Sequence, residues 1–216
     1  MKQYEVVIWD WNGTLANDVE ASLMATNDIL KKRGRQPITL EQYYSYIDTP
    51  ISRFYDKLLD LNEVPMSVIG MEFNKYYSEY FDRLHTGAKE LLQEIQAAGA
   101  KQIILSSSYQ NTIEQDTIRF GIRQYFDEIL AADDLLATGK VERAKMWMAA
   151  QNVAPERMVL IGDTLHDYDA AQAMGTHCIL AAIGHQSEAD LKTTEMPVVT
   201  TFSAIRGLLL KEHIFI

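Results

Sequence analysis

Short apolar runs alternate with longer amphipathic segments along this chain, and the alternation is the strongest constraint on its fold. Four runs are rich in aliphatic and β-branched residues: YEVVIWD, KQIILSSS, RMVLIGD and THCILAA. They are apolar at consecutive positions, which is typical of strands covered on both faces. Two weaker runs, DEILAA and PVVTT, are candidates for further strands, and segments of helical length lie at 87–98, 109–119, 141–151 and 167–174. The pattern predicts an α/β fold, doubly wound around a mostly parallel sheet.

One long stretch after the first apolar run lacks any strand pattern. Between about residues 18 and 85 the sequence has only helical periodicity, and the first helix is expected to end near Gly34 and Pro37. The segment from Thr39 to Gln42 fits a capping box for the next helix. We therefore predict a helical cap at residues 17–85, inserted into an α/β core formed by residues 1–16 and 86–216. The many tyrosines of the insert are interpreted as packing residues.

Charge and length restrict the classes of partner. The 216 residues include 20 basic and 30 acidic side chains, a formal net charge of −10, so neither nucleic acid nor a membrane surface is an expected partner. Neither a signal peptide nor a membrane-spanning stretch is recognisable, which favours a cytoplasmic protein. We expect a monomer or a weak homodimer. The single cysteine, Cys178, lies in an apolar run and is expected to be a buried core thiol.

Polar side chains close three of the apolar runs. Asp10, Ser106 and Asp163 each stand at the end of a run, and Asp167 follows Asp163 by one helical turn. Any one of these acids is equally compatible with an ordinary helix cap. Ligands of open parallel sheets, however, bind at the carboxyl ends of the strands, where these side chains are predicted to meet.

Clustered carboxylates of this kind suit a hard divalent cation. Oxygen ligands without histidine or cysteine favour Mg²⁺, and a carboxylate beside the ion can attack a phosphoryl group to form an aspartyl-phosphate. The turn at Gly13 and Thr14 offers backbone N–H groups to phosphoryl oxygens. A lysine would neutralise the developing charge, and the candidates are Lys140 and Lys145.

These residues together resemble the haloacid dehalogenase superfamily of phosphatases. IWDWNGTL is similar to its first motif, Asp-x-Asp-Gly-Thr, with Asp10 at the nucleophile position, and IILSSS resembles the second, with Ser106 in the catalytic role and Ser107 beside the substrate. The resemblance places Lys140 at the third motif, with Lys145 as the alternative. GDTLHD resembles the fourth motif and implies that Asp163 and Asp167 hold Mg²⁺ together with Asp10.

The resemblance also covers the insert. It is similar to the cap of the subfamily that includes the phosphoglycolate phosphatases, which implies a small phosphorylated metabolite as the substrate. Within the cap, IDTPISRF resembles a specificity loop and puts Arg53 forward as a substrate contact, although a solvated surface arginine is equally compatible. His166, inside the fourth motif, is either a flanking residue or an acid/base group.

The chain departs from the family pattern at one position. Asn12 stands where the resemblance places a second acid, which in such phosphatases protonates the leaving oxygen and activates water. An amide can do neither, but its backbone carbonyl can still face the metal. The sequence thus predicts a slow phosphatase; the alternatives are a carbon–phosphorus or carbon–halogen hydrolase on the same scaffold, or a non-catalytic protein that binds a phosphorylated ligand or a protein partner.

Overall fold

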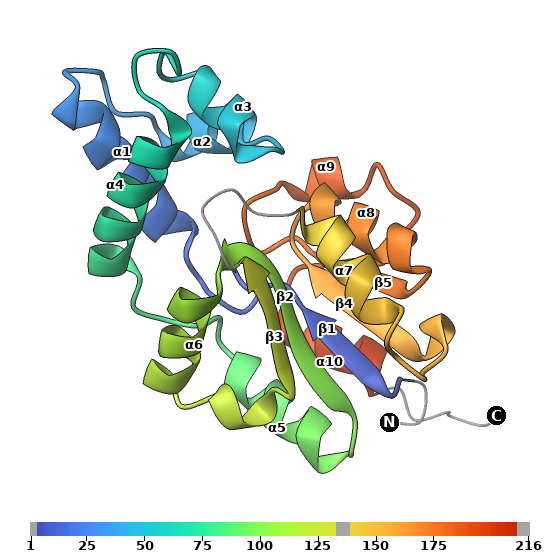
Figure 1. The fold of residues 1–216 in the computed structure, drawn as a ribbon. Helices are drawn as coiled ribbons and strands as arrows, with labels where there is room; N and C mark the ends of the chain where they lie inside the picture. Colours follow the sequence, from blue (N-terminus) through green and yellow to red (C-terminus); the bar gives the residue numbers. More distant parts are fainter. Residues whose placement is uncertain (1–3, 133–138, 211–216) are drawn as a thin grey trace. The chain divides into compact units, whose positions relative to one another are not determined.

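The chain divides into two compact units in the computed structural model, which describes residues 4–132 and 139–210 (Figure 1). One unit comprises Met1–Ala16 and Leu84–Ile216 and contains the sheet, and the other comprises Asn17–Arg83 and is helical. The helical unit ends at Arg83, whereas the predicted insert extends to residue 85. Its role as a cap stays a prediction.

Within the described residues, six parallel strands form a single sheet in the order β3-β2-β1-β4-β5-β6. Their bounds are β1 (Val6–Trp9), β2 (Lys101–Tyr109), β3 (Glu128–Ala132), β4 (Met158–Gly162), β5 (His177–Ala181) and β6 (Val198–Val199). The order confirms the doubly wound α/β prediction, and the two weaker apolar runs form the edge strands β3 and β6. The central strand β1 lies between β2 and β4, so that Val6 is paired with both Lys101 and Met158.

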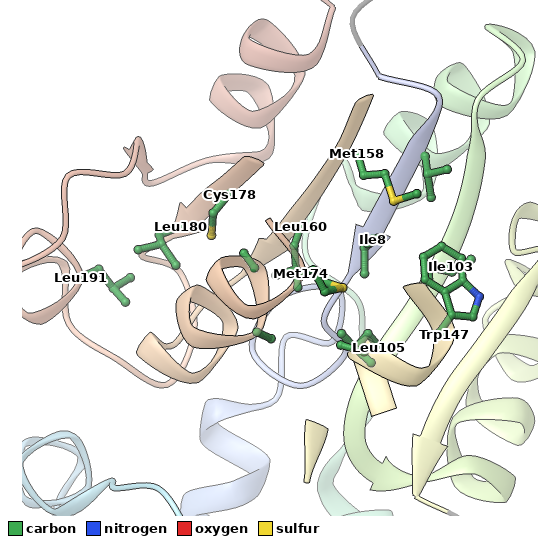
Figure 2. Close-up of a cluster of buried hydrophobic side chains, with 14 residues drawn as sticks. Ile8, Ile103, Leu105, Trp147, Met158, Leu160, Met174, Cys178, Leu180 and Leu191 are labelled. Carbon is green, nitrogen blue, oxygen red and sulfur yellow. The ribbon is translucent and has the colours of Figure 1, made fainter. Parts of the chain in front are cut away.

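Helices cover both faces of this sheet. They are α5 (Ala88–Ala97), α6 (Gln110–Arg119), α7 (Lys140–Met148), α8 (Leu165–Met174), α9 (Glu188–Leu191) and α10 (Phe202–Leu209). On one face, Trp147 of α7 and Met174 of α8 pack with Ile8 and Leu160 in a core that also buries Cys178 (Figure 2). Trp9 points to the opposite face, where its ring stacks on Phe202 of α10 with centroids 6.2 Å apart. Two layers of helices therefore bury the strands on both sides, as their continuous apolar runs require.

The helical unit has its own core. It contains α1 (Val19–Lys32), α2 (Leu40–Tyr46), α3 (Ile51–Asp56) and α4 (Met66–Tyr80). The capping box of α2 is confirmed, since the Thr39 hydroxyl accepts from the Gln42 N–H and the Gln42 side chain accepts from the Thr39 N–H. Tyr43, Tyr55 and Tyr77 are buried, in agreement with a packing role. Among the helices in the described parts of both units, none combines the length and apolar character needed to cross a bilayer.

A buried glutamine links the sheet to α5 and generates a stability prediction. Gln102 on β2 is fully buried, accepts from the Trp9 indole N–H at 3.1 Å and donates to the Leu92 carbonyl at 2.8 Å. Gln102→Leu leaves the buried Trp9 indole N–H without its acceptor and removes the second bond to the Leu92 carbonyl, so urea denaturation should show a free energy of unfolding lower by about 2–4 kcal/mol. Gln93→Leu, on the exposed face of α5, is the control and should change it by less than about 0.5 kcal/mol. Equal effects of the two substitutions would contradict this account.

Candidate active site

The turn after β1 is held in place by backbone hydrogen bonds. The Asp10 N–H still donates to the Ile161 carbonyl of β4 at 2.9 Å, so this residue continues the strand. The Leu15 and Ala16 N–H groups then donate to the Trp11 carbonyl at 3.0 and 2.9 Å, which closes the turn. A fixed turn at this point keeps the Asp10 carboxylate at the carboxyl edge of the sheet.

Three carboxylates meet at that edge. Asp10 follows β1, Asp163 follows β4, and Asp167 lies in the first turn of α8. Each offers one carboxylate oxygen, and these oxygens all lie within 4.8 Å of one another. Asp163 and Asp167 are fully buried and Asp10 nearly so. The pairing of β1 with β4 accounts for this convergence, because neighbouring parallel strands end at the same edge.

A buried lysine lies among these acids. Lys140, the first residue of α7, has an Nζ that contacts Oδ1 of both Asp10 and Asp167. The side chain is only 4% exposed, so these contacts are shielded from water. Lys145 is exposed further along the same helix. Of the two candidate lysines, the structure brings Lys140 to the acids.

Burial and mutual repulsion shift the ionisation of the cluster. Burial raises the pKa of Asp10 well above its usual range; Lys140 opposes this shift, while Asp167 and Asp163 add to it. Burial likewise raises the pKa of Asp163 to about 6. Burial alone would lower the pKa of Lys140, but Asp10 and Asp167 raise it above its ordinary value, which keeps the ammonium charged.

Hydrogen bonds fix two of the acids in orientation. Asp163 accepts from the Thr14 hydroxyl at 3.0 Å and from the His185 backbone N–H at 2.6 Å. Asp167 accepts from the Thr164 N–H at 3.0 Å and the Thr164 hydroxyl at 2.7 Å, as part of a capping box. Asp167 therefore completes the capping box of α8 and belongs to the acid cluster at once. His185 was not among the predicted residues, although it follows the β5 run at the same sheet edge.

The serines at the end of β2 lie in a local irregularity of the sheet. Leu105 pairs with Leu130 and Tyr109 with Ala132, so the register between β2 and β3 shifts across residues 106–108. Ser106 is buried, and its hydroxyl oxygen accepts from the Ser108 N–H at 3.1 Å.

The three serines differ in their surroundings. Ser107 is exposed, whereas the Ser108 hydroxyl donates to Oδ1 of Asn12 at 2.5 Å. The structure therefore brings Ser106 and Asn12 together through Ser108. The sequence does not single out Ser108, because three consecutive serines give no signal for which of them turns inward.

Comparison with known proteins shows the family of this chain. A family model described as haloacid dehalogenase-like hydrolase matches residues 7–181. The chain belongs to this family.

Several relatives of this haloacid dehalogenase-like hydrolase are similar over most of its length. A phosphoglycolate phosphatase of Photobacterium profundum is 24% identical over 214 residues, covering 92% of this chain and 93% of the relative. The tyrosine-protein kinase PtkA of Mycobacterium tuberculosis is 26% identical over 208 residues, covering 94% and 71%. A solved structure described as a predicted phosphatase from Clostridium acetobutylicum has a TM-score of 0.82 at 20% identity, covering 97% of this chain and 99% of that one. The last comparison shows the shared fold alone.

Two other predicted residues of this haloacid dehalogenase-like hydrolase are not members of the acid cluster. Arg53 belongs to α3 of the helical unit, where its exposed side chain lies 3.9 Å from Asp48. Its role toward a substrate stays a prediction. His166 is half-buried on α8, and burial, with Lys140 adding to it, lowers its pKa.

The donor set fits a hard divalent cation. The cluster has three carboxylates and one ammonium group, a formal sum of −3 + 1 = −2. Oxygen donors with excess negative charge match the preference of Mg²⁺, and none of the three clustered residues is a soft ligand.

The close packing of Gly13 against Asp163 gives a prediction for the turn. Gly13 has φ +73°, and a Cβ added there would lie 2.1 Å from Asp163 Oδ2. Gly99 also has a positive φ, +81°, but its added Cβ meets no atom within 4 Å. Gly99→Ala should therefore lower the free energy of unfolding by only about 1–2 kcal/mol, from backbone strain alone. Gly13→Ala should lower it by about 3 kcal/mol or more, because Asp163 must also move. Urea denaturation of both variants tests this, and similar losses would show that the contact with Asp163 adds nothing.

Proposed function

We propose that this hydrolase is a Mg²⁺-dependent phosphatase that cleaves a small phosphomonoester through an aspartyl-phosphate on Asp10. The observation that carries the proposal is the convergence of Asp10, Asp163 and Asp167 around the buried Lys140 ammonium. Such a cluster combines a nucleophile, a cation site and a fixed positive charge within one buried edge. The similarity to phosphoglycolate phosphatases supports the assignment to phosphate ester chemistry.

The metal site in this proposal uses oxygen ligands only. Asp10, Asp163, Asp167 and the backbone carbonyl of Asn12 would hold Mg²⁺. When bound, the ion would offset the negative charges of the carboxylates and the phosphoryl group and so allow them to approach. The hydrogen bonds from Thr14 and the His185 N–H keep Asp163 oriented for this role.

The protein groups then account for phosphoryl transfer. A carboxylate oxygen of Asp10 forms a bond to phosphorus as the bond to the leaving oxygen breaks, and the electron pair goes to that oxygen. Water next attacks phosphorus, releases the Asp10 carboxylate and leaves both of its protons on the phosphate product. Lys140 stabilises the transferred charge, while the Ser106 hydroxyl and the N–H groups of Gly13 and Thr14 hold phosphoryl oxygens, with Ser107 at the rim.

The helical unit supplies specificity in this proposal. Acting as a cap, it would exclude water and select a small phosphorylated metabolite, with Arg53 contacting the part of the substrate away from the phosphoryl group. Carbon–phosphorus or carbon–halogen cleavage and a binding-only role remain the alternatives. The intact, buried acid cluster with its lysine favours the phosphatase over them.

The nucleophile and the metal site can be tested separately. Asp10→Asn should abolish turnover, because an amide does not attack phosphorus. For the same reason, no phosphoenzyme should be found after an acid quench of this variant. Mg²⁺ should raise the thermal midpoint of the wild type, with about 2.7 kcal/mol of stabilisation at 100 times its Kd. Asp167→Asn should lose most of that shift, whereas Asp169→Asn, exposed on the same helix, should keep it. Turnover by Asp10→Asn or after complete chelation would refute the proposal.

The amide at position 12 predicts an unusual time course. General acid/base groups typically contribute about 10²–10⁴-fold, so hydrolysis of the phosphoenzyme should be slow and rapid-quench experiments on an activated ester should show a burst. Asn12→Asp should raise steady-state turnover and remove the burst. If the wild type shows no burst and Asn12→Asp gains nothing, another group, such as His166, carries the proton transfers.

A further inference from the structure

The two oxygens of the Asp167 carboxylate have different surroundings. Oδ2 accepts two hydrogen bonds, from the Thr164 N–H at 3.0 Å and from the Thr164 hydroxyl at 2.7 Å, so both of its lone pairs are used. Oδ1 contacts the Lys140 ammonium on the side of the acid cluster. While the capping box holds, Asp167 can therefore direct only Oδ1 toward a cation.

The loop that follows β5 holds Asp163 in one orientation. The His185 backbone N–H donates to Asp163 Oδ2 at 2.6 Å. Gly184, the residue before it, lies so close that an added Cβ would be 2.1 Å from the same oxygen and 2.5 Å from the Gly13 carbonyl oxygen. Only a residue without a side chain leaves room for the loop to approach this acid.

The next residue of this loop holds the start of α8. Oε1 of Gln186, a half-buried side chain, accepts from the backbone N–H of Leu165, the first residue of α8, at 2.6 Å. This N–H is one of the four at a helix start that have no partner within the helix. Two adjacent residues, His185 and Gln186, thus hold Asp163 and the helical turn that carries Asp167.

Mg²⁺ and Ca²⁺ place different demands on such a pair of acids. Mg²⁺ requires a near-ideal octahedron of oxygens at short distances, whereas Ca²⁺ takes about six to eight oxygens in a flexible geometry and often binds both oxygens of one carboxylate. Acids held in one orientation, with a single oxygen of Asp167 directed to the cluster, suit the smaller ion. Acids that are free to rotate suit the larger ion better.

We propose that Gln186 is a positioning residue that keeps Asp167 as a single-oxygen donor and thereby makes the site selective for Mg²⁺ over Ca²⁺. This inference rests on the proposed function and adds a determinant of its cation. Without the Gln186 acceptor, the Leu165 N–H loses its partner and the first turn of α8 loosens. Asp167 is then able to turn both oxygens toward a larger ion.

Calorimetric titration of the metal-free protein with Mg²⁺ and with Ca²⁺ tests the selectivity. The quantity compared is the ratio of the Ca²⁺ Kd to the Mg²⁺ Kd, because a general loss of stability weakens the binding of both ions together. Gln186→Met has a similar length and no acceptor oxygen. It should weaken Mg²⁺ binding by about tenfold, as is typical when a residue that orients a ligand is lost, and Ca²⁺ binding by less than about threefold.

Two variants are controls for this measurement. Gln186→Glu keeps an acceptor oxygen at the same distance from the backbone, and its added charge should strengthen the binding of both ions alike, so the ratio should stay at the wild-type value. Gln172→Met makes the same change as Gln186→Met at an exposed position of α8 and should alter neither Kd. If Gln186→Met does not fold, Gln186→Asn, which is too short to reach Leu165, replaces it with the same expectation.

The outcomes separate this inference from the proposed function. An unchanged ratio in the folded Gln186→Met or Gln186→Asn variant would overturn the inference and leave the Mg²⁺-dependent phosphatase standing. A wild type that binds both ions equally well would do the same. A wild type that does not bind Mg²⁺ would overturn both.

Hydrogen exchange checks the contact between Gln186 and α8 without any metal. In the wild type and in Gln186→Glu the Leu165 amide should be protected, although amides at a helix start usually exchange fast. In Gln186→Met this amide should exchange at least about tenfold faster, while that of Ala171, in the interior of α8, should keep its rate. Equal Leu165 rates in the wild type and Gln186→Met would show that Gln186 does not hold this turn and would overturn the proposal.

Discussion

The ion cluster formed by Lys140 with Asp10 and Asp167 is the interaction on which the rest of the site depends. Carboxylates buried at the edge of an apolar sheet destabilise a fold unless charge and hydrogen-bond partners compensate them. Lys140 contacts two of the three acids, and Thr14 and the His185 N–H orient the third. The cluster nevertheless keeps excess negative charge, so folding alone does not satisfy it. A group of this kind is expected where binding, rather than stability, has determined the residues.

The sheet topology explains how distant segments supply this cluster. β1 is central, and its neighbours β2 and β4 end at the same edge, so that Asp10, Ser106 and Asp163 are brought together by strand pairing alone. The apolar residues of these strands are buried under helices on both faces, which makes the edge a rigid platform. The starts of α7 and α8 then add Lys140 and Asp167. The residues of the candidate site thus lie at the ends of strands and the starts of helices, and the buried interiors of these strands and helices hold them in place.

Sequence reasoning recovered the features that follow from local pattern. Continuous apolar runs predicted the strands. Because the carboxyl ends of parallel strands meet at one edge of a sheet, the sequence also predicted that Asp10 and Asp163 lie close together. It could not choose between Lys140 and Lys145, since five helical residues separate them by about 140° around the axis and the direction of the core is set by packing. Ser108 and His185 were missed because their contacts join distant segments and, for Ser108, depend on a register shift that no local pattern encodes.

The amide at position 12 has an electrostatic consequence for the same cluster. Three carboxylates and one ammonium sum to −2, which a single divalent cation would reduce to −2 + 2 = 0. An ionised aspartate at position 12 would leave a negative charge beside the incoming phosphoryl group, so it must carry a proton when the substrate arrives. Asn12 avoids that requirement, and Ser108 holds it through a neutral hydrogen bond. With such a cation bound, the proposed site would be formally neutral without proton uptake, and the amide at position 12 would not transfer protons.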